Sequence, residues 1–233
     1  MKNFDLTAIL LNGEFGAMLL KGIRLTLEIA AGSWLLAMSL ALVLLVVRLT
    51  PNVIAQRAVA AYVSYHRNVP TLVQLMLWYF GISSLLPNDV QGWLSEHNGE
   101  ALFAIIALGL CQAAYFSEDL RSGLRSVPDG QTEAARALGH GYLGAMRFVI
   151  LPQAVRNAVP ALVNHSVSLF KNSSLAMAIG VAELTHAVKE IESQSFRTFE
   201  TYLIATVLYL VFSLLIMAAG AWLSRRHSIT GTR

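Results

Sequence analysis

The first candidate for a reactive or ligand-binding site is a set of glycines, Gly139, Gly141 and Gly144, in the segment GHGYLG, which matches G-x-G-x-x-G. A dinucleotide-binding turn of this pattern needs a preceding strand, a following helix and an acidic residue about 20 residues later. Here the preceding residues TEAARAL favour a helix, and the segment 155–175 contains no Asp or Glu. The sequence therefore argues against a nucleotide site at these glycines.

Other kinds of chemistry find no better support. The pattern G-x-x-x-x-G-K-[ST] of a phosphate-binding loop is absent, so we do not expect this chain to bind ATP through such a loop. Cys111 is the single cysteine, which excludes an intramolecular disulfide and a cysteine-based metal cluster. No His, Asp and Glu cluster has a catalytic spacing. We expect no catalytic residue, no metal, no cofactor and no enzyme activity.

The composition is that of a membrane protein. Of 233 residues, 55% are hydrophobic and 13% charged, and the mean hydropathy is +0.56. A soluble domain usually has about 25% charged residues. The net charge of +3 then reflects basic cytoplasmic loops, and no nucleic-acid partner is expected.

Five apolar segments are long enough to cross a bilayer, which takes about 20 residues. They are 22–47, 58–86, 101–121, 158–180 and 202–223. No linker or internal repeat divides the chain, so we expect a single transmembrane domain over 1–233. The predicted fold is all-α and polytopic, with about five transmembrane helices and a cytoplasmic loop between the third and fourth.

The loop charges predict the orientation. Arginines gather after the first span, between the third and fourth, and after the fifth: Arg48, Arg57, Arg121, Arg125, Arg136, Arg147, Arg156, Arg225, Arg226 and Arg233. The loop after the second span holds Asp89, Glu96 and Glu100 without Lys or Arg. Because basic loops stay in the cytoplasm, we expect the N-terminus outside and the C-terminus inside. Asp5 and Glu14 interrupt any signal-peptide core.

The glycines then belong to a cytoplasmic helix–turn–helix. We expect a short helix over 131–138, ended by Gly139 in a left-handed cap. A second short helix over 142–150 would end at Pro152. Ala134 and Ala135 would form a small-residue surface that another protein can approach closely.

These residues carry a resemblance to a known family. The pattern E-A-A-x-x-x-G followed by I-L-P, at Glu133, Ala134, Ala135, Gly139 and Pro152, resembles the permease subunits of ATP-binding-cassette (ABC) importers. The segments SVPDGQTEAARALG and LFKNSSLAMAIGVAEL are similar to the polar amino acid branch, and RNVP and KNSS to its glutamate/aspartate members. The resemblance is strongest over about 60–185, within a core of about 20–224, and places the EAA loop at about 124–156.

The resemblance implies a partner-driven transporter in the bacterial inner membrane. Two permease subunits, identical or different, would form the pathway for a polar amino acid, which the similarity to the glutamate/aspartate members predicts to be acidic. An ABC ATPase dimer would bind ATP and dock on the EAA loop, and a periplasmic amino-acid-binding protein would deliver the solute. Glutamine, histidine, arginine or cystine are alternative solutes. A gradient-driven secondary transporter, and a loop helix that lies on the membrane surface, are the other interpretations.

Polar residues inside the spans are candidates for the substrate pathway. Asn164, Ser168 and Lys171 share one face of the fourth span. They could line a water-filled path, because polar groups in a membrane usually face a cavity or protein. They could also bridge helices, with Lys171 extending to the interface.

Two further charged residues are open to the same alternatives. Arg67 could bind a solute carboxylate, pair with an acid such as Glu118, or anchor the interface. Glu118 could relay protons or bind a cationic solute, or pair with Arg121 or Arg125. Pro70 should kink the second span and free the carbonyl near position 66.

Overall fold

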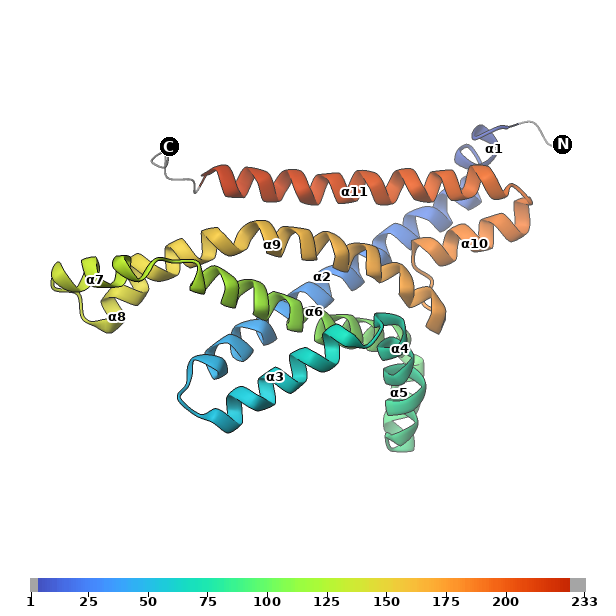
Figure 1. The fold of residues 1–233 in the computed structure, drawn as a ribbon. Helices are drawn as coiled ribbons and strands as arrows, with labels where there is room; N and C mark the ends of the chain where they lie inside the picture. Colours follow the sequence, from blue (N-terminus) through green and yellow to red (C-terminus); the bar gives the residue numbers. More distant parts are fainter. Residues whose placement is uncertain (1–3, 227–233) are drawn as a thin grey trace.

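The molecule is elongated and helical (Figure 1). The computed structural model describes residues 4–226, which contain helices and no strand. Four long helices make the body: α2 (Gly13–Leu49), α6 (Gly99–Arg125), α9 (Leu151–Asn172) and α11 (Thr198–Arg226). α9 lies between α6 and α11 and packs on both, while α2 crosses α6 obliquely.

Shorter elements gather at the two ends of this body (Figure 1). One end holds α7 (Asp129–Ala137), α8 (Tyr142–Ala145), the end of α11 and the turn from α2 to α3 (Val53–Asn68). The other holds α1 (Thr7–Leu10), α5 (Asn88–Glu96) and α10 (Leu184–Ser195). α5 and α10 lie in the connections that follow the second and fourth predicted spans, and the sequence analysis did not predict these two helices. α10 begins because the buried Glu183 carboxylate caps the first turn, accepting hydrogen bonds from two backbone N–H groups.

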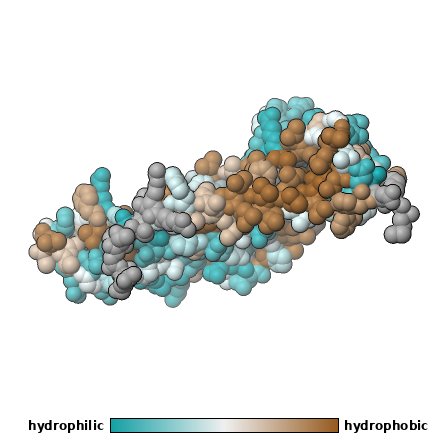
Figure 2. All heavy atoms as spheres, turned by 90° about the horizontal axis from the view of Figure 1, so that it is seen from above, coloured by the Kyte–Doolittle hydropathy of each residue, from teal (hydrophilic) through white to brown (hydrophobic). Residues whose placement is uncertain are grey.

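Three of the predicted spans are single helices long and apolar enough to cross a membrane: Gly13–Leu49, Gly99–Arg125 and Thr198–Ser224. The first and last bury little of their surface in this chain, at 22% and 17% of the most apolar window, against 61% for α6. Figure 2 shows a broad hydrophobic area on the face that carries α11. α6 is therefore the central helix, and α2 and α11 offer apolar surface to lipid or to another subunit.

The second predicted span is not one helix. α3 ends at Asn68, and after Val69 and Pro70 the chain continues as α4 (Thr71–Met76), η1 (Leu77–Ile82) and η2 (Ser83–Leu85). The predicted break at Pro70 is confirmed. Because proline has no N–H, the carbonyl of His66 loses its helical partner, and Gln74 Nε2 donates to it at 3.1 Å instead.

The fourth span differs from its prediction at both ends. It begins earlier, since η3 (Met146–Ile150) runs directly into α9, and it ends in the 3₁₀ turn η4 (Ser173–Ile179). The prediction that Pro152 ends the helix over 142–150 was wrong. The backbone widens to a π-turn, in which Leu151 N–H donates to Met146 O. Pro152 is the second residue of α9, and the helical segment continues through it although proline has no N–H to donate to the preceding turn.

Close packing of α6 on α9 depends on one glycine. A Cβ at Gly123 would lie 2.4 Å from Ala154 O and 2.8 Å from Ala158 Cβ. Small residues allow such backbone approach between membrane helices.

We therefore expect Gly123→Ala to lower the free energy of unfolding by about 1–3 kcal/mol through overpacking. Thermal unfolding of the purified protein in detergent would measure this. Gly16→Ala is the matched control, because a Cβ at Gly16 of α2 meets nothing within 4 Å. Equal stability of the two variants would contradict the packing of α6 on α9.

Candidate functional site

The loop between α6 and α9 has the predicted cap. Gly139 has a φ of 85°, and the N–H groups of His140 and Gly139 donate to Ala135 O at 3.1 Å and to Arg136 O at 3.0 Å. This is the Schellman arrangement, which satisfies the last carbonyls of α7 and turns the chain sharply. A residue with a Cβ at position 139 would strain this turn.

α7 presents only part of the predicted docking surface. Glu133 and Ala134 are exposed, whereas Ala135 is 2% exposed and faces inward. The prediction that Ala134 and Ala135 share one accessible surface was therefore wrong. Adjacent helical residues point about 100° apart, so α7 packs through one and presents the other. Pro152 lies beyond η3, as the second residue of α9, and does not shape the turn at Gly139.

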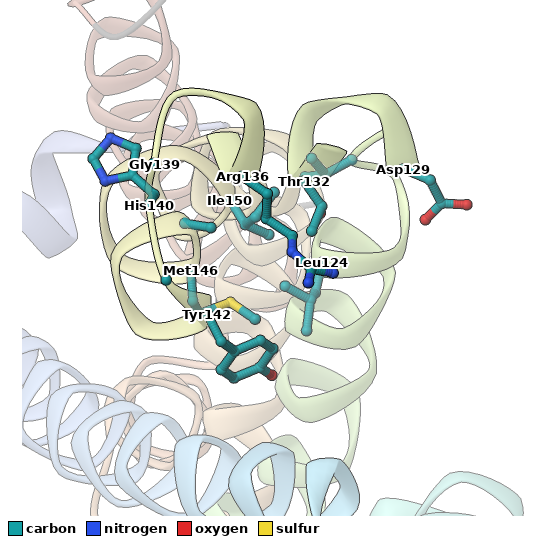
Figure 3. Close-up of a pocket in the computed structure, with 12 residues that line it drawn as sticks. Leu124, Asp129, Thr132, Arg136, Gly139, His140, Tyr142, Met146 and Ile150 are labelled. Atoms are coloured by element: carbon teal, nitrogen blue, oxygen red, sulfur yellow. The ribbon is translucent and has the colours of Figure 1, made fainter. Parts of the chain in front are cut away.

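A cavity of about 610 Å³ lies inside this loop, between the end of α6, α7 and α8. Figure 3 shows Arg136 and Thr132 of α7 directed toward Leu124 of α6, with Tyr142 and Met146 across from them. Asp129 and His140 point away (Figure 3). Among the residues that the structure describes, no group of three or more His, Cys, Asp or Glu could hold a metal ion.

The polar stripe of the fourth span is open in this chain. Asn164 and Lys171 are exposed and Ser168 is half-buried, while Val167 and Phe170 on the other side are buried. The Ser168 hydroxyl donates to Asn164 O at 3.2 Å, a bond within the helix. These three side chains therefore do not bridge helices of this chain, and they remain available to a path or to a partner.

Glu118 pairs with arginines. Its carboxylate accepts hydrogen bonds from Arg48 and from Arg121 Nε, the latter at 3.0 Å. The pairing with Arg121 was among the predicted alternatives, whereas Arg48 was not foreseen. The side chains of Arg48 and Glu118 are 18% and 16% exposed. The Arg67 guanidinium lies over the Tyr115 ring, 5.5 Å from its centre, and is exposed.

The sequence also gave no sign of a second pair, between Asp119 and His165. His165 Nδ1 lies 2.6 Å from Asp119 Oδ2, joining α9 to α6. The His165 ring lies 5.1 Å from the Tyr115 ring, so Arg67, Tyr115, His165 and Asp119 form a continuous row. The sequence signal that was available is that unpaired polar groups are costly in a membrane. It indicates that Asp119 and His165 need partners, but it does not identify those partners.

Comparison with known proteins shows the family of this chain. Residues 33–229 match the family described as the binding-protein-dependent transport system inner membrane component. The chain belongs to this family. The apolar helices are those of a multi-pass inner-membrane permease, a transport component and not an enzyme.

Several relatives are amino acid permeases. A probable amino-acid permease protein of Bacillus subtilis, YxeN, is 36% identical over 84% of this chain and 85% of its own length. The glutamate/aspartate import permease protein GltJ of Escherichia coli is 29% identical, covering 90% of this chain and 87% of its own. A crystal structure of an amino acid ABC transporter with histidines has a TM-score of 0.83 at 28% identity, covering 97% of this chain and 100% of that one. This chain is thus a permease subunit of an amino-acid ABC importer.

The geometry of Glu118 predicts a structural role. Glu118→Gln should lower the free energy of unfolding by about 1.5–3 kcal/mol, because two partly buried guanidinium groups lose their charged acceptor. Chemical denaturation of the purified permease would measure it. Glu28→Gln, which removes the carboxylate of the exposed Arg24–Glu28 pair, should change little. A Glu118→Gln permease of normal stability that no longer transports would instead assign Glu118 to the solute.

Proposed function

We propose that this permease carries a polar, acidic amino acid inward across the bacterial inner membrane, driven by ATP hydrolysis on partner subunits. The observation that carries the coupling part is the exposed Glu133–Ala134 surface of α7, which the left-handed Gly139 fixes at one tip of the molecule. ATP is bound by the partner ATPase dimer, and this chain needs no cofactor of its own.

The tip with α7 and α8 faces the cytoplasm in this proposal, and the N-terminus lies outside. Support comes from the arginines of the α2–α3 turn, the end of α6 and α7, which lie at this end together with the end of α11 (Figure 1). Basic loops are retained in the cytoplasm. Arg233 and the side chains of Arg225 and Arg226, which supported the same orientation in the sequence, lie outside the described residues.

Two further partners complete the proposal. A second permease subunit would cover the apolar and polar surfaces that α9 and its neighbours leave open. The relatives GltJ and GltK are both named glutamate/aspartate import permease proteins, which favours a second, non-identical subunit. A periplasmic amino-acid-binding protein would deliver the solute at the end with α5 and α10.

The polar stripe on α9, formed by Asn164, Ser168 and Lys171, supports an acidic solute. Lys171 is exposed at the end of α9, with Ser168 and Asn164 along the same face. An acidic amino acid brings two carboxylates and one ammonium group, and an unpaired carboxylate is costly in a low-dielectric path. Other relatives are named for nopaline, octopine and arginine transport, so another polar amino acid is the alternative solute.

Ala134→Arg tests the docking surface. Ala134 is exposed, so the larger charged side chain should leave the fold intact and obstruct a partner that approaches α7. We expect lower recovery of the ATPase when the permease is purified, and lower solute-stimulated ATP hydrolysis in vesicles. Gly92→Arg in α5, where a Cβ meets nothing within 4 Å, adds the same charge at the opposite end. ATPase recovery with Ala134→Arg equal to that with Gly92→Arg would refute docking on α7.

Lys171→Met tests the solute. Loss of a charge-assisted hydrogen bond should raise the KM for an acidic amino acid by roughly 10-fold to 150-fold, since such a bond contributes about 1.5–3 kcal/mol. The KM for a neutral amino acid should change less. Lys189→Met, which removes another exposed lysine, in α10, is the control, with uptake measured at matched expression. An unchanged KM for the acidic solute would contradict a role of Lys171 in solute binding and would mean that the binding protein sets the selectivity.

A further inference from the structure

A second cavity, of about 540 Å³, lies where α2, α3 and α6 meet, outside the loop and the α9 stripe. Its lining contains four arginines and no acidic residue: Arg48, Arg57, Arg121 and Arg125. Its remaining wall is mostly apolar and includes Leu45, Leu49 and Val53. A concave site with this many guanidinium groups and an apolar edge is suited to an anion that carries a hydrophobic part.

The positive charge in this cavity is only partly balanced. Arg48 and Arg121 share a single carboxylate, that of Glu118. Arg57 and Arg125 are exposed, and neither has an ion pair with any residue that the structure describes. The planar guanidinium group binds phosphate and carboxylate oxygens through paired N–H groups. Two free guanidinium groups facing one hollow therefore leave room for a phosphate.

The cavity lies at the depth of lipid headgroups. α2 has 37 residues, about 55 Å at 1.5 Å per residue, whereas the hydrocarbon core is about 30 Å thick. The predicted apolar span within α2 ends at residue 47, and Arg48 and Leu49 form the last turn of the helix, so the cavity lies next to the end of that span.

An apolar stripe leads from the cavity into the membrane. Leu49, Val46, Leu42 and Leu35 are 57%, 63%, 48% and 62% exposed. Their spacing of three, four and seven residues puts them on one face of α2. Leu49 belongs to both the cavity and the stripe. A molecule with its anionic group among the arginines can therefore extend a hydrocarbon chain along α2.

We propose that this cavity binds the phosphate group of an anionic glycerophospholipid, with an acyl chain along the α2 stripe. Basic pockets between membrane helices on the cytoplasmic side are typical sites for such headgroups. The site is independent of the amino acid carried and of docking on α7. Binding there would clamp the α2–α3 turn to the end of α6, the helix that leads directly into the EAA loop.

The test uses the permease complex, with its ATPase, purified in detergent and freed of lipid. Titration with phosphatidylglycerol or phosphatidylcholine, followed by native mass spectrometry, measures the affinity for each. Arg57→Gln and Arg125→Gln should each weaken phosphatidylglycerol binding about fivefold, and the double variant about 25-fold, at low salt. Arg24→Gln, which removes an exposed arginine of α2 far from the cavity, should leave it unchanged. Phosphatidylcholine should bind weakly to every form.

Val46→Ser and inorganic phosphate distinguish a lipid from a free anion. Val46→Ser removes apolar surface without altering charge, so it should weaken the binding of phosphatidylglycerol. Inorganic phosphate should displace the bound lipid only when it is present in large excess. Displacement at comparable concentrations, with no effect of Val46→Ser, would mean a free-anion site and overturn the proposal. So would unchanged phosphatidylglycerol affinity in the double variant. Loss of the ATPase from the double variant, with lipid binding intact, would identify the cavity as a partner interface and overturn it too.

Discussion

An unpaired polar group is costly in a bilayer, and the contacts between the helices of this structure depend on that constraint. The clearest cases are the groups that leave regular helix geometry. Pro70 releases the carbonyl of His66, and Gln74 satisfies it. Glu183 closes the first turn of α10 and also accepts a hydrogen bond from Tyr209 of α11 at 2.9 Å. Each break in a helix is therefore also a connection between helices.

Charge pairs serve the same purpose around α6. Glu118 joins α6 to the end of α2 through Arg48, and Asp119 joins α6 to α9 through His165. The two acids are adjacent in sequence and point to different neighbours, because successive helical residues are rotated by about 100°. Together with the close approach at Gly123, they make α6 the helix against which α2 and α9 are set.

The two regions of functional interest are connected by a continuous helical segment. α8, η3 and α9 follow one another without interruption from Tyr142 to Asn172. The segment begins beside the cap at Gly139 and carries Asn164, Ser168 and Lys171 in its second half. A displacement of the loop can therefore reach the stripe along this segment, although the π-turn at Met146–Ile150 and the prolines Pro152 and Pro160 interrupt its regular hydrogen bonding.

The sequence by itself determined the membrane class, three of the five spans, the break at Pro70, the left-handed Gly139 and the family. These depend on local composition, local stereochemistry and a contiguous motif. Only the tertiary structure decided that Ala135 is buried and that the helical segment continues through Pro152 instead of ending there. It also decided that Glu118 meets Arg48, that Asp119 meets His165 and that four arginines share one cavity. These outcomes depend on which faces of distant helices meet, and that is settled by packing and by the pairing of charges across more than forty residues of chain.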